Sequence, residues 1–326
     1  MEMPREILVT GEAGFIGSSL CDKLLEEGYS VISLDNFNDL YDPRIKERNT
    51  VNALKHENFT IIRGDILDMQ LLENIFSKYA VDKIVHLAAI AGVRPSLVNP
   101  NKYIDVDIKG TVNLLEVARK YEIKQFIFGS SSSVYGTNSR IPFSEEDRVD
   151  LQISPYATAK RAAELYCATY HHLYGIPITI LRFFTVYGPR QRPDMAIHEF
   201  TRLMSQGKPI SMFGSGKSER DYTYIDDAVE GIVKSMERVY GFETFNIGNS
   251  KMVKLQDLVE IIADKLNVQP KIERLPEQLG DVPITCADIS KARKMLGYNP
   301  STPIEQGIEK FIKWYKEKNE NFTPNH

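Results

Sequence analysis

The sequence predicts an α/β protein with a doubly wound parallel (Rossmann) sheet and a smaller C-terminal domain. Short β-branched runs alternate with helical segments through the first half of the chain, as in sheets built with right-handed crossovers. The first run, residues 7–9, ends in a glycine-rich turn that opens a helix, and the second, 31–34, ends in Asp35. We expect residues 1–184 to form the main domain, with 222–248 returning to it, and residues 185–326 to form the second domain.

Each predicted element has a local reason. Strands are expected where apolar and β-branched residues cluster, at 7–9, 31–34, 59–62, 83–87, 124–128 and 177–181. Helices are expected at 15–27, 69–79 and 101–120, the last with apolar residues at 112, 114, 115 and 117. A further helix begins at Pro155, which suits a first helical turn, and continues through an alanine-rich run. Asp226 or Asp227 is expected to cap the helix that follows it.

Composition excludes several classes of function. With 42% hydrophobic and 26% charged residues, the 326-residue chain reads as an ordinary globular protein. A net charge of −4 gives no support to binding of nucleic acid or of an anionic membrane. Cys21, Cys167 and Cys286 are far apart, which indicates reduced thiols and no metal site. We see no signal peptide and no apolar run long enough for a bilayer, and we expect a cytoplasmic protein.

The glycine-rich turn predicts a nucleotide site. Gly11, Gly14 and Gly17 allow a tight turn and bring a pyrophosphate close to the N–H groups at the helix start. Asp35 at the next strand end would accept hydrogen bonds from a ribose 2′-hydroxyl and repel a 2′-phosphate. A glycine turn followed by an acidic strand end can also be purely structural. The strand–helix–strand context favours nucleotide binding, with NAD rather than NADP as the cofactor.

A second pattern indicates acid–base chemistry. Tyr156 and Lys160 stand four apart at a helix start and therefore share a face. An ammonium and a helix N-terminus both lower the pKa of a phenol, so Tyr156 is a candidate base. The serines at 130–133 follow a predicted strand, where hydroxyls line the ligand crevice of such sheets or satisfy their own backbone. Taken alone, Tyr-x-x-x-Lys is common, and an amphipathic helix with one aromatic residue and one lysine on its flank explains it better than chemistry does.

Together these motifs resemble the extended short-chain dehydrogenase/reductase superfamily, in its branch of NAD-dependent epimerases and dehydratases of nucleotide sugars. Residues 10–17 are similar to its Thr-Gly-x-x-Gly-Phe-Ile-Gly fingerprint, 64–66 to its Gly-Asp-Ile element and 86–89 to its cofactor-side strand. The resemblance implies a catalytic set of Ser131, Tyr156 and Lys160. It implies NAD contacts from Gly11, Gly14, Phe15, Ile16, Gly17, Asp35, Asn36, Asp65, Ile66, Leu87, Ala88, Ala89, Tyr156 and Lys160. The chain departs from the family at Asp107, where an asparagine is usual.

Within this branch the resemblance favours a 4-epimerase. The dehydratases carry Asp-Glu directly after the catalytic threonine, and this chain has Ser132 and Ser133 there. The glutamate of the decarboxylases is also missing. We expect Tyr156 to take the proton of the sugar 4-hydroxyl while a hydride passes to NAD, and the hydride to return to the other face of the turned 4-keto sugar.

Three segments resemble UDP-glucuronate 4-epimerases in particular. Residues 35–43 look like their Asn-Asp-Tyr-Tyr-Asp loop, and 91–94 like their Ala-Gly-Val-Arg, with Pro95 in place of a tyrosine. Thr185, at which UDP-glucose 4-epimerases have asparagine, is followed by Arg-Pro-Asp-Met as in the glucuronate enzymes. The predicted reaction is the interconversion of UDP-glucuronate and UDP-galacturonate. The implied substrate contacts are Arg94, Ser132, Ser133, Thr185, Arg192, Arg220 and Asp281.

Roles within that set differ. Ser132, Ser133 and Thr185 are expected to hold the sugar carboxylate, with Arg192 at the edge of the site and Arg220 on the diphosphate. The family also implies a homodimer through the helices near 101–120 and 156–173. A UDP-glucose or UDP-N-acetylglucosamine 4-epimerase stays open as an alternative, as does a family member that binds NAD without turnover.

Overall fold

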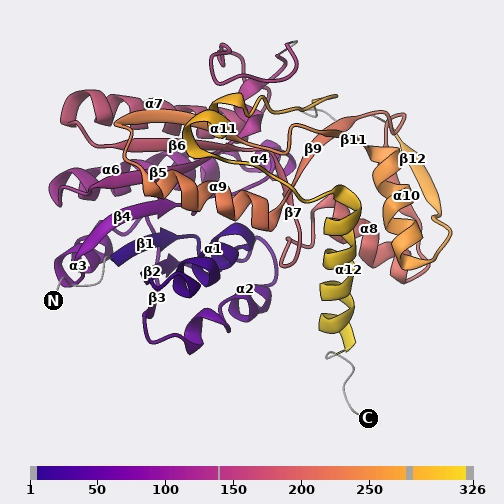
Figure 1. Ribbon diagram of the computed structural model, residues 1–326, viewed down its shortest axis with the longest axis horizontal. Helices are drawn as coiled ribbons and strands as arrows, with labels where there is room; N and C mark the ends of the chain where they lie inside the picture. The colour runs from indigo at the N-terminus through magenta and orange to yellow at the C-terminus, as the bar shows by residue number, and fades with distance from the viewer. Residues whose placement is uncertain (1–5, 139, 277–281, 321–326) are drawn as a thin grey trace.

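A seven-stranded parallel sheet forms the centre of the computed structural model, which describes residues 6–138, 140–276 and 282–320. Its strands run in the order β10-β6-β5-β4-β1-β2-β3, and helices pack along the sheet (Figure 1). The order reverses between β1 and β4, which is the point at which such sheets bind ligands. The predicted doubly wound parallel sheet is therefore confirmed.

The strands of this sheet are β1 (Glu6–Thr10), β2 (Ser30–Asp35), β3 (Phe59–Arg63), β4 (Val81–His86), β5 (Gln125–Ser131), β6 (Ile178–Phe183) and β10 (Phe242–Ile247). All except β10 lie close to a predicted strand, and β10 falls within the segment 222–248 predicted to return to the main domain. The helices of this part of the chain are α1 (Phe15–Glu26), α2 (Pro43–Asn49), α3 (Met69–Lys78), α4 (Val93–Val98), α5 (Pro100–Tyr103), α6 (Gly110–Lys120), α7 (Pro155–Tyr174) and α9 (Ile225–Glu237). β10 joins the sheet at its edge by pairing with β6.

Alternate residues of the strands feed two separate apolar cores. Ile7 and Val9 of β1 point into a core that also contains α1 and α9, whereas Leu8 points into a core with α3, α6 and α7. Side chains of a strand alternate between the two faces of its sheet, so a strand covered on both sides reads as a continuous apolar run. This explains why the strand predictions rested on unbroken β-branched runs.

The helix predicted at 101–120 contains a local distortion. Its backbone stays helical from α5 into α6, but residues Ile104–Lys109 form a π-helical turn between them. Such turns occur at functional sites more often than elsewhere. Asp107, the residue that departs from the family pattern, lies within this turn and is buried.

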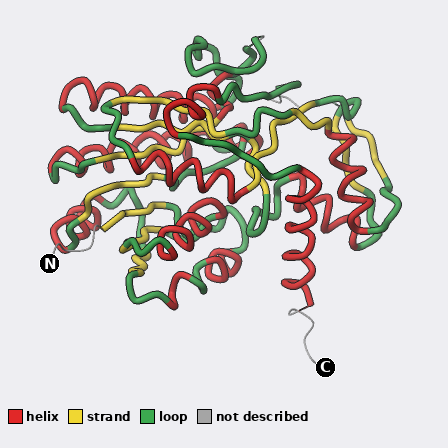
Figure 2. Tube along the Cα trace, in the orientation of Figure 1, coloured by secondary structure: helices red, strands yellow, loops and turns green. Residues whose placement is uncertain are grey.

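Most of the remaining helices and strands gather at one end of the molecule. They are β7 (Thr185–Tyr187), α8 (Ala196–Ser205), β8 (Ile210–Phe213), β9 (Glu219–Tyr224), β11 (Met252–Lys254), α10 (Leu255–Leu266), β12 (Ile272–Leu275) and α12 (Ile304–Glu320). α11 (Ser290–Leu296) instead packs against β10 and α9 of the central part. β7, β9 and β11 form one small sheet and β8 and β12 another, with α8, α10 and α12 beside them (Figures 1 and 2).

The expected cap of α9 is wrong. The residue before this helix is Tyr224, and no side chain there accepts a hydrogen bond from the first turn. Asp227 accepts hydrogen bonds of 3.0 and 3.1 Å from the backbone N–H groups of Ser301 and Thr302. Its carboxylate therefore holds the segment that leads into α12, a contact that sequence spacing does not reveal.

Candidate active site

A cavity of about 390 Å³ opens at the carboxyl ends of the central strands. Its wall combines the glycine turn, the ends of β2, β4 and β5, and the start of α7. Most residues predicted from the sequence lie in this wall. They are Gly11, Gly14, Phe15, Ile16, Gly17, Asp35, Asn36, Asp65, Ile66, Leu87, Ala88, Ala89, Ser131, Ser132, Ser133, Tyr156, Lys160, Thr185 and Arg192.

Two predicted substrate contacts, Arg94 and Arg220, lie outside this wall. The Arg94 guanidinium lies over the Phe213 ring, 4.9 Å from its centroid, so it joins α4 to β8. Arg220 donates hydrogen bonds to the backbone carbonyls of Glu219 and Pro283 and does not line the cavity. Asp281 falls outside the described residues.

The glycine turn is shaped to receive an anion. Gly11 has a φ of +76°, and a Cβ there would lie 2.6 Å from the backbone nitrogen of Ala88. A Cβ on Gly17 would lie 2.2 Å from the carbonyl oxygen of Gly11. α1 begins after Gly14 in the cavity wall, and no side chain within the described ranges caps its N-terminus. Uncapped N–H groups at a helix start bind phosphate, so the turn fits the pyrophosphate of a dinucleotide.

Two carboxylates continue this site at the strand ends. Asp35 accepts hydrogen bonds from the backbone N–H groups of Ala13, at 3.1 Å, and Phe37, at 2.7 Å. Each oxygen keeps a lone pair for a ribose hydroxyl. Asn36 donates a 2.9 Å hydrogen bond to Asp65, which ties the ends of β2 and β3 together. Burial raises the pKa of Asp35, and the charge of Lys46 opposes that change.

The start of α7 places the catalytic candidates. The Ser154 hydroxyl accepts a 3.2 Å hydrogen bond from the Ala157 N–H, and the helix begins at Pro155. Tyr156 and Lys160 both reach the cavity, and the Lys160 ammonium donates a 2.9 Å hydrogen bond to the Gly129 carbonyl. The Ser131 hydroxyl donates a 3.1 Å hydrogen bond to the Ser133 hydroxyl. The end of β5 and the start of α7 thus meet in one wall.

The expected effect of Lys160 on Tyr156 is wrong in this structure. Burial raises the pKa of Tyr156 above its ordinary value, the Ser131 hydroxyl lowers it, and the charge of Asp107 raises it further. The Lys160 ammonium is engaged by the Gly129 carbonyl, and burial lowers its own pKa. Burial outweighs the helix start because a phenolate loses its hydration inside the wall.

Asp107 is a buried carboxylate whose charge acts on Tyr156 and Lys160. One of its oxygens accepts a 2.8 Å hydrogen bond from the Ile90 N–H, and the other has no hydrogen-bond partner among the described residues. Burial raises the pKa of Asp107 to about 6, against the opposing charge of Lys160. We predicted no site role for this residue, although its departure from the family pattern marked it.

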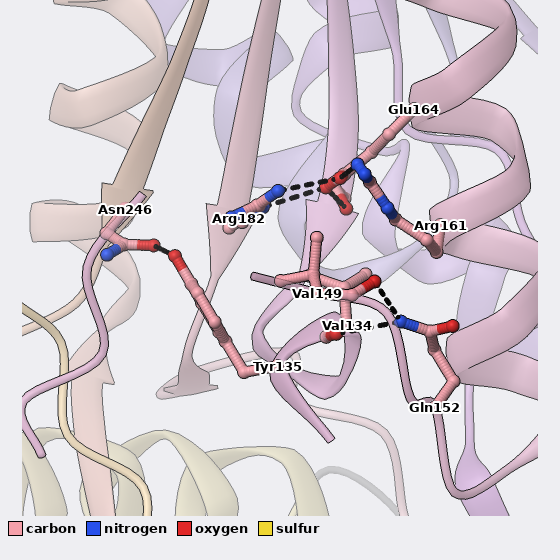
Figure 3. Close-up of polar contacts among 9 residues, drawn as sticks. Val134, Tyr135, Val149, Gln152, Arg161, Glu164, Arg182 and Asn246 are labelled. Carbon is pink, nitrogen blue, oxygen red and sulfur yellow. Dashed lines mark hydrogen bonds and ion pairs between the residues drawn. The ribbon is translucent and has the colours of Figure 1, made fainter. Parts of the chain in front are cut away.

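Polar contacts brace the site from behind (Figure 3). Glu164, one turn after Lys160 on α7, accepts hydrogen bonds from Arg182 of β6 and from the Ser130 hydroxyl. The Tyr135 hydroxyl donates a 2.6 Å hydrogen bond to Asn246 of β10. These contacts join α7, the serine segment and two strands of the sheet into one rigid support.

Arg192 extends into the cavity from the segment after β7. Its guanidinium forms two hydrogen bonds with Asp194, of 3.0 and 2.8 Å, and its side chain is only 15% exposed. The pair orients the guanidinium within the cavity wall. Lys46 and Tyr41 also line the cavity, and we did not predict them as site residues. The loop motif at 35–43 drew attention to this region, but no periodic pattern identifies a lysine on the helix after it.

Comparison with known proteins identifies the family. The family model described as GDP-mannose 4,6 dehydratase matches residues 8–311. The chain belongs to this family. The predicted resemblance to the extended short-chain dehydrogenase/reductase superfamily is thereby confirmed.

Its similar relatives include epimerases. A UDP-glucuronate 4-epimerase of Thermodesulfobacterium geofontis is 44% identical over 311 residues, covering 95% of this chain and 96% of the relative. The crystal structure of UDP-glucuronic acid 4-epimerase from Bacillus cereus, in complex with UDP-glucuronic acid and NAD, matches with a TM-score of 0.90 at 38% identity. That match covers 96% of this chain and 99% of the other. A Thermotoga maritima UDP-glucose 4-epimerase with UDP-glucose matches with a TM-score of 0.88 at 34% identity, over 96% and 99% of the two chains.

Other classes of site find no support in the described part of the chain. No described helix combines the length and apolar character needed to cross a bilayer. Among the described residues, no group of three or more His, Cys, Asp or Glu side chains is arranged to hold a metal ion. The three cysteines are buried and unpaired.

Proposed function

We propose that this chain is an NAD-dependent 4-epimerase that interconverts UDP-glucuronate and UDP-galacturonate. The observation that carries the proposal is the convergence on one cavity of Ser131, Tyr156 and Lys160, beside the glycine turn and the hydroxyls of Ser132 and Thr185. The relatives named UDP-glucuronate 4-epimerase support the same reading. Because Ser132 and Ser133 replace the acid pair of the dehydratases, no residue at those positions can protonate a leaving hydroxyl.

NAD fits the wall of the cavity. The glycine turn and the start of α1 would hold its pyrophosphate, Asp35 the adenosine ribose, and Asp65 and Ile66 the adenine side. When bound, NAD supplies the acceptor and later the donor of the hydride at C4 of the sugar. We propose that residues 1–184 with 222–248 form this cofactor-binding unit, and that 185–326 bind the UDP-sugar.

The protein groups manage the proton of the sugar 4-hydroxyl. Tyr156 takes this proton as the C4–H bond breaks and returns it after the ring has turned. The Ser131 hydroxyl donates a hydrogen bond to O4, where negative charge develops. The hydrogen bond from Lys160 to Gly129 and the burial of the Lys160 side chain keep water from competing at this end of the cavity.

The carboxylate at C5 sets the substrate. A 4-keto glucuronate is a β-keto acid and loses carbon dioxide unless its carboxylate is held away from the reactive orientation. Ser132, Ser133 and Thr185 place short hydroxyl donors in the wall, and such donors bind a carboxylate without filling the space in which the ring turns. The Arg192 guanidinium is hydrogen-bonded to Asp194, and this contact keeps it from binding the sugar carboxylate in a rigid bidentate pair.

The test is kcat/KM for UDP-glucuronate against UDP-glucose and UDP-N-acetylglucosamine, with carbon dioxide monitored. Donors built for a carboxylate are left unpaired by a neutral sugar, so we expect a preference of about 10⁴-fold or more for UDP-glucuronate. Equal turnover of UDP-glucose favours the neutral-sugar epimerase, and dominant decarboxylation contradicts the role of the serines. Absence of any interconversion while NAD binds would leave a non-catalytic family member.

We further propose that two copies associate through α7 and the π-helical turn before α6. Ile104, Leu165 and Tyr166 are exposed on these elements, at 54%, 52% and 43% of their surface. α7 packs against the π-helical turn, so these exposed apolar side chains belong to neighbouring elements, as in many protein interfaces. Light scattering at micromolar concentration should give a dimer mass, and Leu165→Arg should give a monomer. A monomer mass for the unmodified chain contradicts the proposal.

A further inference from the structure

Lys46 is a buried cation in the wall of the cavity. Its side chain lies on α2, is 5% exposed and lines the cavity. Its ammonium lies 5.2 Å from the centroid of the Tyr41 ring, and within the described ranges it makes no hydrogen bond or close ion pair. A buried ammonium loses strong hydration, so burial without a partner is costly. Its position in the cavity wall indicates that a ligand supplies the partner.

The helix that carries Lys46 is fixed against the glycine turn. Asn49 donates a 3.1 Å hydrogen bond to the Ala13 carbonyl, and Ala13 donates its own N–H to Asp35 at 3.1 Å. Lys46 and Asn49 are three residues apart and therefore share a face of α2. Asp42 caps the start of this helix by accepting a hydrogen bond from the Arg44 N–H. The ammonium is thus held at the side of the glycine turn.

The charges around Lys46 select the ligand. The site already offers the uncapped N-terminus of α1, which attracts an anion. Asp35 is close enough to influence the charge of Lys46 but makes its hydrogen bonds to backbone N–H groups instead. A cation and a helix N-terminus in the wall of one cavity match a pyrophosphate diester, which carries two negative charges.

We propose that Lys46 binds the pyrophosphate of NAD, as a second cationic group beside the N-terminus of α1. The inference rests on the proposed function, because that function supplies the dinucleotide. The diphosphate of the UDP-sugar has the same chemistry, and Arg192 also lies near Lys46. The contacts of α2 with the glycine turn favour the cofactor, and the experiment separates the two sources.

The experiment measures binding by calorimetry to the full chain after bound nucleotide has been removed. Lys46→Met removes the charge and keeps the length, and Lys46→Arg keeps the charge. Lys55→Met is the matched control, because Lys55 is an exposed lysine outside the cavity wall whose ammonium donates a hydrogen bond to Asn52. The probes are NAD, ADP, adenosine and UDP. Circular dichroism melting verifies folding, and Lys46→Gln replaces the methionine variant if that variant unfolds.

We expect Lys46→Met to weaken the binding of NAD and ADP about 10- to 100-fold and to leave the affinities for adenosine and UDP unchanged. The NAD and ADP affinities of Lys46→Arg and Lys55→Met should stay close to those of the unmodified chain. The salt dependence of NAD binding should be shallower in Lys46→Met, since one cation is lost.

Three results overturn the inference alone while NAD binds the unmodified chain. The first is an unchanged NAD affinity in Lys46→Met. The second is an equal loss of affinity for adenosine, which would mean that Lys46 balances the charge of Asp35. The third is a loss of affinity for UDP alone. Failure of the unmodified chain to bind NAD overturns the proposed function together with the inference.

Discussion

Arg182 and Glu164 form a buried ion pair in which Nε and Nη2 of the arginine lie 2.9 and 2.8 Å from the two carboxylate oxygens (Figure 3). Arg182 belongs to β6 and Glu164 to α7, one turn beyond Lys160. The pair therefore locks the helix that carries the catalytic candidates to the central sheet. Ser130 adds a 2.6 Å hydrogen bond to the same carboxylate.

Removing one partner of this pair should destabilise the fold strongly. Arg182→Met leaves the Glu164 charge buried without its main partner, which costs about 3–5 kcal/mol. Urea unfolding measures the change. Arg161→Met is the control, because Arg161 contacts the same carboxylate from a partly exposed position and should cost about 0–1 kcal/mol. Similar losses in the two variants contradict this account.

The same pair predicts a dependence of stability on pH. Burial alone raises the pKa of Glu164, but the hydrogen bonds and charge of Arg182 bring it below its ordinary value. Its stabilising contribution is therefore complete above the pKa of the unfolded chain and is lost as pH falls through the lower folded pKa. Unfolding free energies measured from neutral to acidic pH should fall less steeply in Glu164→Gln than in the unmodified chain.

Tyr156→Phe should abolish most turnover while NAD still binds. A positioned acid–base group contributes about 10²- to 10⁴-fold, and phenylalanine keeps the ring but removes the proton carrier. Initial rates and NAD calorimetry measure the two effects. Tyr103→Phe is the control, since that hydroxyl donates to the Gly92 carbonyl and its ring packs against Tyr156. Near-normal activity in Tyr156→Phe would sink the assignment.

Asp107→Asn should move the pH profile of kcat/KM toward lower pH. Above pH 6 the Asp107 carboxylate is largely ionised, and its charge raises the pKa values of Tyr156 and Lys160. Asparagine keeps the shape and the bond to Ile90 but removes the charge, so the tyrosine ionises at lower pH. The charge of Asp107 also raises the pKa of Tyr103, after burial, so the shift of Tyr156 is compared with that of Tyr103. An unmoved profile with reduced kcat assigns Asp107 to structure only.

Ser132→Ala with Ser133→Ala should convert part of the turnover to decarboxylation. Losing two hydroxyl donors frees the carboxylate of the 4-keto sugar to adopt the reactive orientation. The ratio of released carbon dioxide to epimerised product measures the effect and should rise several-fold. Ser144→Ala is a control outside the cavity. A constant ratio shows that other groups hold the carboxylate.

The sequence by itself determined the parallel sheet and the alternation of strands and helices along the chain, because both depend on local patterns. Ile7 to Val9 must be buried on both faces, and Pro155 with an alanine-rich run must begin a helix. The glycine turn of the nucleotide site could also be recognised locally, since its function depends on backbone conformation and N–H groups within one short segment. The site assignments and the domain division stay predictions.

Only the tertiary structure decided which distant polar groups meet. Asn49 of α2 contacts the Ala13 carbonyl of the glycine turn, and Asp227 holds residues 301 and 302, although nothing in the sequence spacing predicts either contact. The ionisation of Tyr156 follows the same rule. The sequence offered a nearby lysine, but the folded wall buries the phenol and brings Asp107 toward it, and burial outweighs the expected stabilisation. Hydration and long-range charge depend on the complete fold, so no local pattern can specify them.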